Sequence, residues 1–169
     1  MNVVATADLK QPVDIITAGS LKDFLHDSEI YGGRVSYFKS KEMNGRIIIF
    51  PSGKLISVGA RSVEEAFNNF NLTLNSLLEN KLVNSNLLDM KVRNIVSTVD
   101  FKKTLELDSL PLKLNAIYEP EQFSGAILKF ETPKVTALIF SSGKAVITST
   151  KNLQIVNEAV NQLSELLFS

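Results

Sequence analysis

The feature that most constrains the fold is an internal duplication. Residues 2–10 (NVVATADLK) return as residues 94–102 (NIVSTVDFK), an offset of 92 positions. A second block, IIFPSGK ending at Lys54, returns as LIFSSGK ending at Lys144, an offset of 90 positions. Repeated blocks in the same order predict two similar structural units that together cover nearly the whole chain.

The two copies are expected to span residues 1–82 and 83–169 as parts of one continuous structure. The change of offset gives the first copy about two extra residues between the blocks. We expect them in the turn at residues 40–45, opposite the tighter turn at 131–134, because surface turns absorb length at little cost.

Within each copy the hydrophobic pattern changes from a period of two to a period of 3.6, which predicts strands followed by a long helix. The first copy's long helix has a predicted capping box, with Ser62 as N-cap and Glu65 three residues later. One strand, a short helix, three antiparallel strands and a long helix, twice over, predict an α+β fold with helices on one side of the sheet. The second copy's expected strands are 94–100, 123–130, 135–140 and 144–149, and its expected helices are 108–116 and 153–167.

Both faces of the predicted sheet are apolar. In residues 135–140, one parity holds Val135, Ala137 and Ile139, and the other holds Thr136, Leu138 and Phe140. A sheet with one solvated face alternates apolar and polar residues, and this one does not. Two explanations stay open: a partner covers the second face, or the two copies form a sandwich that buries it.

Composition excludes several classes of function. The chain has no cysteine and one histidine, so disulfides, thiolate catalysis, cysteine zinc sites and histidine metal clusters are not expected. Asp8 and Asp100 are related by the repeat, but no acid–base or nucleophile constellation surrounds them, and no cofactor is expected. The short apolar runs predict no membrane span, and the first residues show no secretory signal, so we expect an intracellular protein. The 18 basic and 18 acidic residues give zero net charge, which argues against nucleic acid unless the cations are clustered.

The second copy contains the blocks YEPEQF at residues 118–123, Pro133-Lys134, and ALIFSSGK at residues 137–144. In these blocks especially, the chain resembles the TATA-box-binding protein family, in its archaeal form. The resemblance implies two pseudo-symmetric repeats that form a saddle-shaped, curved antiparallel sheet with helices on its convex face. It also implies a non-enzymatic initiation factor, in the cytoplasm or nucleoid of an archaeal cell, that lays the concave face on the minor groove of A·T-rich DNA.

The resemblance also assigns roles to residues. Counting back from Phe38, matched to Phe130, places the first copy's outer wedge at Tyr31, and Tyr37 then replaces Lys129 and loses a phosphate contact. Val58 replaces Thr148 and loses a donor. The DNA wedges are Tyr31, Phe50, Phe123 and Phe140. The groove floor and its polar contacts are Asn2, Val4, Ile48, Ile56, Val58, Asn94, Val96, Leu138, Val146 and Thr148. The phosphate contacts are Lys54, Arg61, Lys129, Lys144 and Lys151, and the docking site for transcription factor B is Glu119, Glu121 and Gln122.

The implied partners are double-stranded A·T-rich promoter DNA, transcription factor B and, indirectly, the RNA polymerase assembly. Self-association through the apolar face is expected when DNA is absent, and no membrane partner is expected. Val58, Tyr37 and the zero net charge motivate an alternative, a divergent paralogue that uses the same fold for protein binding or regulation. A third reading, an accessory domain beside a catalytic module, lacks any attached module or catalytic residue.

Overall fold

A computed structural model describes every residue from Met1 to Ser169. Its contacts divide the chain into one unit of residues 2–93 and another of residues 94–169, to which Met1 is also assigned. The boundary between residues 82 and 83 that the repeats suggest remains a prediction.

The first unit is a sheet with one long helix. Its strand order is β2-β3-β4-β5-β1, followed by the start of β6. The elements are β1 (Asn2–Asp8), α1 (Ile15–Gly19), β2 (Phe24–His26), the 3₁₀ turn η1 (Ile30–Gly33), β3 (Ser36–Phe38), β4 (Arg46–Ile49), β5 (Lys54–Ala60) and α2 (Val63–Glu79).

The second unit repeats this plan with the strand order β6-β9-β8-β7. Its elements are β6 (Asp89–Asp100), η2 (Leu107–Ser109), α3 (Leu110–Leu114), β7 (Ala126–Glu131), β8 (Lys134–Ile139), β9 (Lys144–Thr150) and α4 (Leu153–Phe168). The expected helix at 108–116 is thus split between η2 and α3, where Asn115 ends α3 in a left-handed conformation. The strand expected from residue 123 begins only at Ala126.

The nine strands share one hydrogen-bonded order, β2-β3-β4-β5-β1-β6-β9-β8-β7, and the registers within each unit are antiparallel. A single sheet order confirms the predicted α+β class with two repeats.

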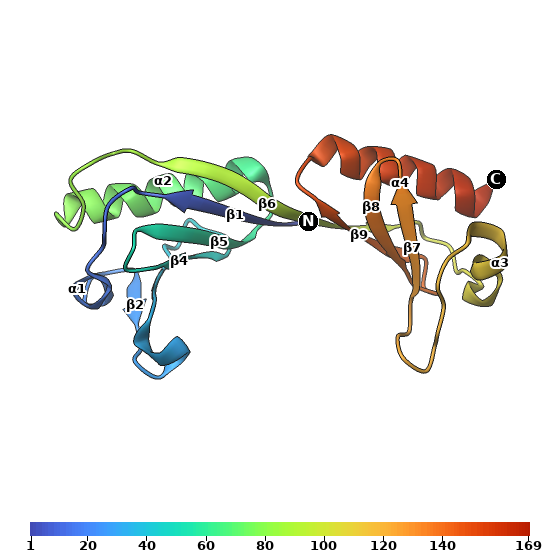
Figure 1. Cartoon of the computed structure of the whole chain (residues 1–169), viewed down its shortest axis with the longest axis horizontal. Coiled ribbons are helices and arrows are strands. Elements are labelled where there is room, and N and C mark those ends of the chain that lie inside the picture. The colour runs from blue at the N-terminus through green and yellow to red at the C-terminus, as the bar shows by residue number, and fades with distance from the viewer. The chain divides into compact units, whose positions relative to one another are not determined.

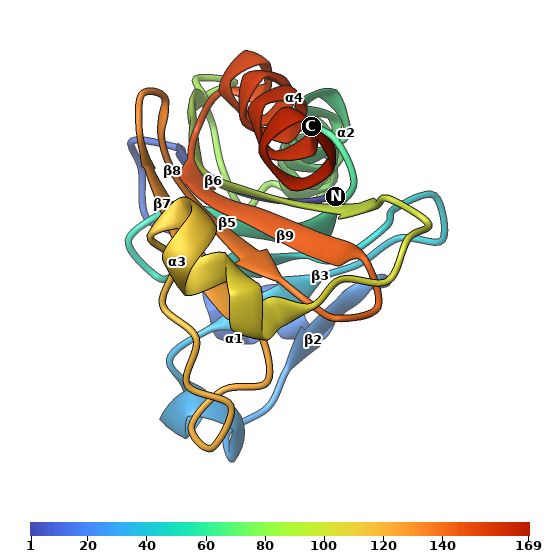
Figure 2. The ribbon, with the colours of Figure 1, turned by 90° about the vertical axis from the view of Figure 1, so that its right-hand side faces the viewer.

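Each long helix covers one face of its own unit. In the first unit α2 packs against β1, β4 and β5, where Phe70 and Leu77 are fully buried with Ile47 and Leu55 (Figure 1). In the second unit α4 packs against β8 and β9, and Leu163 is fully buried (Figure 2). The opposite face of each unit has no helix on it.

The predicted cap of α2 is present with one difference. The Ser62 hydroxyl accepts a hydrogen bond from the Glu65 backbone N–H at 3.0 Å. The Glu65 carboxylate reaches back to the backbone N–H of Arg61 instead of that of Ser62, and it also accepts from the Asn44 side chain. These donors lower the pKa of Glu65, with the Arg61 hydrogen bond as the largest cause.

The strand registers contradict the placement of the two extra residues. Phe38 pairs with Ile47 and Leu128 pairs with Ala137, so eight residues lie between the paired positions in both copies. The length difference therefore lies elsewhere than in the turn at 40–45.

The extra residues lie in the loop between β2 and β3. Leu25 pairs with Tyr37 and encloses eleven residues, whereas Ile117 pairs with Ile127 and encloses nine. By strand register Tyr37 thus corresponds to Ile127. The loops 27–35 and 118–125, called the stirrup loops below, extend away from α2 and α4 respectively (Figure 1).

Candidate nucleic-acid interface

The uncovered face of the second unit is apolar and half-buried. Leu138 on β8 pairs with Val146 on β9, and both side chains lie on the face opposite α4. Thr136 and Thr148 form the neighbouring pair on the same face. The next residue along β9, Ile147, is fully buried beneath the helix. Alternating residues therefore serve two purposes: one set builds the core, and the other forms a smooth surface with few polar groups.

The first unit has the same surface on β4 and β5. Ile48 pairs with Ile56, and both are half-buried on the face opposite α2. Beside them Arg46 pairs with Val58, where the second unit has its two threonines. The first unit thus exchanges two hydroxyls for a cation and an apolar side chain.

The two asparagines of the repeat occupy matching strand positions. Asn2 is exposed at the start of β1, and Asn94 is half-buried on β6. Val4 and Val96, two residues further along, are half-buried, whereas Val3 and Ile95 between them are fully buried. Each asparagine therefore shares its strand face with an apolar floor residue of the same unit.

An aromatic pair stands at the end of the second unit's open face. Phe123 and Phe140 meet edge to face with ring centroids 5.8 Å apart, and Phe123 is 36% exposed. A Cβ on Gly125 would lie 2.8 Å from the Phe123 ring and 3.0 Å from the Phe140 ring, so a larger residue there would require the rings to shift. The backbone of Gly125 thus passes close to both rings.

The corresponding end of the first unit is more open. Tyr31 is 72% exposed, lies in the stirrup loop with φ +50°, and borders a hollow together with Phe50, Ile48 and Ile56. The match between Phe38 and Phe130 that led to Tyr31 does not hold in the register, because Phe38 stands where the second unit has Leu128. Tyr31 as a wedge remains a prediction.

Cations follow the hairpin turns at matching places. Lys54 and Lys144 are the exposed first residues of β5 and β9, directly after glycines with φ of +84° and +82°. A Cβ on either glycine would approach a backbone carbonyl oxygen to 1.9 Å, so these turns require glycine. Neither lysine has a carboxylate within salt-bridge distance. The other predicted phosphate contacts, Arg61, Lys129 and Lys151, are also exposed.

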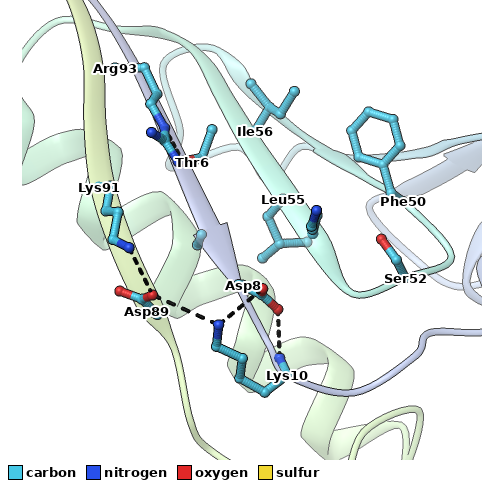
Figure 3. Close-up of a pocket in the computed structure, with 12 residues that line it drawn as sticks. Thr6, Asp8, Lys10, Phe50, Ser52, Leu55, Ile56, Asp89, Lys91 and Arg93 are labelled. Atoms are coloured by element: carbon cyan, nitrogen blue, oxygen red, sulfur yellow. Dashed lines mark hydrogen bonds and ion pairs between the residues drawn. The ribbon is translucent and has the colours of Figure 1, made fainter.

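A charged hollow of about 450 Å³ borders the first unit's open face (Figure 3). The Lys10 ammonium lies 3.2 Å from Asp8 and 3.9 Å from Asp89, and Lys91 lies 3.3 Å from Asp89. Arg93 donates from Nε to the Thr6 hydroxyl at 2.8 Å. The strand expected at residues 94–100 thus begins earlier, because residues 89–93 form the first part of β6.

Asp8 and Asp100 have the same structural role in the two units. Each carboxylate accepts the backbone N–H two residues later, from Lys10 at 2.8 Å and from Lys102 at 2.9 Å. Both lysines have positive φ, 57° and 58°. The pKa of Asp8 is lowered mainly by the Lys10 backbone hydrogen bond, and that of Asp100 mainly by the Lys102 side chain. These aspartates stabilise a tight turn.

The second stirrup loop presents polar side chains outward. Glu119, Glu121 and Gln122 are all exposed. The Glu119 carbonyl accepts the backbone N–H groups of Gln122 at 2.9 Å and Phe123 at 3.0 Å, which forms one helical turn. This turn connects the exposed carboxylates directly to the aromatic pair.

Two cations near the open face were missed at the sequence level. Lys39, not Tyr37, stands at the register position of Lys129, and its backbone N–H donates to the Asp23 carbonyl. Arg46 stands at the position of Thr136. For Lys39 the signal lies in the strand register, which the matching phenylalanines at 38 and 130 obscured. The position of Arg46 also follows from the offset of 90 between the second repeated blocks.

No group of three or more metal-ligating side chains lies close enough to hold a metal ion. None of the helices combines the length and the apolar character that crossing a bilayer requires.

The fold and this surface define a class: a two-repeat α+β protein with an open apolar sheet face, flanked by aromatic side chains and cations. The family model described as transcription factor TFIID (or TATA-binding protein, TBP) matches residues 1–80 and 89–169. The chain therefore belongs to the TATA-binding protein family, and it is a general transcription factor of that non-enzymatic, DNA-binding type.

Relatives cover most of the chain. A TATA-box-binding protein of Cenarchaeum symbiosum is 38% identical over 153 residues, which is 90% of this chain and 84% of the relative. One of Methanothermobacter thermautotrophicus is 36% identical over 155 residues, with the same coverage of 90% and 84%. The structure of Methanococcus jannaschii TBP matches with a TM-score of 0.83 at 28% identity, over 99% of this chain and 95% of that one.

Proposed function

We infer that the chain binds A·T-rich promoter DNA in the minor groove, bends it by inserting aromatic side chains between base steps, and recruits transcription factor B. The observation that carries this proposal is the open face of the second unit. There a floor of Leu138 and Val146 ends at the edge-to-face pair Phe123 and Phe140, beside the unpaired Lys144.

Each part of that surface has a physical counterpart in DNA. An apolar floor with few hydrogen-bonding groups suits A·T pairs, because the minor groove of G·C pairs adds an amino donor that would lose its water. Apolar wedges unstack base steps at a cost of a few kcal/mol, which burial of apolar surface and phosphate contacts offset. The threonine pair and Asn94 supply the few polar groups that face the groove.

The exposed carboxylates of the second stirrup loop support the recruitment step. Glu119 and Glu121 offer acceptors to a basic partner surface without occupying the groove-facing strands. Transcription factor B is therefore proposed to dock on Glu119, Glu121 and Gln122, while DNA occupies the open face.

The proposal is tested by a mobility shift on a TATA-box duplex and on a scrambled G·C-rich duplex, with and without transcription factor B, at two salt concentrations. We expect a shift on the TATA duplex alone, with a salt dependence equivalent to roughly four to eight phosphate contacts, and a further shift with the partner. A double variant, Glu119→Gln with Glu121→Gln, should lose the further shift and keep the first. An equal shift on the scrambled G·C-rich duplex, in the absence of transcription factor B, contradicts the proposal.

Val58 and the more open aromatic end of the first unit favour the second candidate, a paralogue that uses the open face for protein binding or regulation. The same experiment separates the two. Binding to transcription factor B without measurable affinity for any TATA duplex would select the second candidate.

A further inference from the structure

Arg46 breaks the chemical symmetry between the two open faces. It is the first residue of β4 and pairs with Val58, whereas Thr136, at the same place on β8, pairs with Thr148. Its strand neighbours alternate as expected: Ile47 is fully buried against α2, and Ile48 lies on the open face. The Arg46 side chain therefore belongs to the open face of the first unit.

The guanidinium group is held by an aromatic ring. Its Cζ lies 4.9 Å from the centroid of the Tyr37 ring, and Tyr37 is only 7% exposed although it lies on the open face. Arg46 itself is exposed and has no carboxylate within 4 Å. Stacking of this kind fixes the plane of a guanidinium and leaves its N–H edges free to donate.

A second cation borders the same place. Lys39 and Arg46 line one hollow with Tyr31 and Tyr37, and Asp23 is the acidic residue that contributes to its lining. In the second unit the matching positions are Lys129 and Thr136, with one cation in place of two. At these two matching positions the first unit therefore carries one cation more than the second.

We propose that Arg46, stacked on Tyr37, is a phosphate-binding residue of the first unit and supplies a backbone contact that the second unit does not make at Thr136. The inference rests on the proposed function. Arginine is suited to this role because its planar fork donates two parallel hydrogen bonds to phosphate oxygens, and the stack reduces the freedom lost on binding. The added charge strengthens binding in the half of the interface where Val58 removes a hydroxyl donor.

The test is the salt dependence of binding to a TATA duplex for the wild type, Arg46→Met and Lys129→Met. Methionine keeps an apolar stem over Tyr37 and removes the charge, so a role limited to covering the ring would leave the slope unchanged. The slope of log K against log[salt] is negative, and we expect each variant to reduce its magnitude by about 0.9, the loss of one phosphate contact. Urea unfolding of Arg46→Met should match the wild type.

Three outcomes are distinguishable. A reduced slope for Arg46→Met supports the inference. If Arg46→Met keeps the salt slope of the wild type while the slope of Lys129→Met falls in magnitude, the inference is overturned. The proposed function then stands, because the wild type still binds the duplex. Absence of wild-type binding to any A·T-rich duplex overturns both.

Discussion

Adjacent residues on β9 should respond to substitution in opposite ways. Ile147 is fully buried beneath α4, whereas Val146 is half-buried on the open face. Truncating a buried isoleucine to alanine removes its transfer free energy and leaves a cavity, so Ile147→Ala should cost about 2–5 kcal/mol of unfolding free energy. Val146→Ala removes two carbons worth about 0.8 kcal/mol each when fully buried, and in a half-buried position the cost should stay below about 1 kcal/mol.

For DNA affinity, Val146→Ala should have the larger effect and Ile147→Ala the smaller one. If Val146 is covered by the minor groove, the loss of two fully buried carbons costs about 1.6 kcal/mol, or roughly 15-fold in affinity. Ile147 never faces the groove, so its variant should bind normally in the fraction that stays folded. Stability is measured by urea unfolding at two protein concentrations, which also reveals self-association, and affinity by fluorescence anisotropy on a labelled TATA duplex.

Two results would refute this reasoning. Equal destabilisation by Val146→Ala and Ile147→Ala would mean that the open face is interior to the free protein. Unchanged DNA affinity of Val146→Ala would mean that the groove does not cover this face.

Two further predictions concern α2 and its contacts in the first unit. The Ser57 hydroxyl is fully buried without a hydrogen-bond partner, at the register position of Ile147. Ser57→Ala should therefore raise the urea midpoint, by about 1 kcal/mol in free energy, and a clear loss of stability would show that the hydroxyl has a partner. Glu65 has a folded-state pKa below its ordinary value of 4.5, so its contribution is present above pH 4.5 and is lost as the pH falls through the lowered pKa. Thermal unfolding between pH 5 and pH 3 should show a smaller decline for Glu65→Gln than for the wild type, and parallel curves would count against this role.

The internal repeats and the two hydrophobic periods were enough to predict the α+β fold class with two similar units. The apolar residues on both parities of residues 135–140 predicted a sheet with two apolar faces, and what covers the second face stayed open. Val135, Ala137 and Ile139 occupy one parity and are all buried. The long helices and the Ser62 cap followed from local rules that tertiary contacts did not override.

The strand register of the first unit could not be predicted from the sequence. Phe38 and Phe130 are identical residues in similar surroundings, yet cross-strand pairing equates Phe38 with Leu128. A two-residue shift keeps every side chain on its face, so the hydrophobic pattern cannot detect it. The longer stirrup loop and the match of Lys39 to Lys129 followed from that pairing and not from the hydrophobic pattern. The charged start of β6 was missed because its strand character comes from pairing with β1, which its own residue pattern does not reveal.

The central claim is that the open face bends DNA. It is tested most directly by fluorescence transfer between dyes at the two ends of a short duplex carrying a TATA site. We expect binding of the wild type to bring the ends closer, with higher transfer than in the free duplex, and Phe140→Ala to remain folded without this increase. A saturated wild-type complex with the transfer of free DNA, or full bending by Phe140→Ala, would contradict the claim.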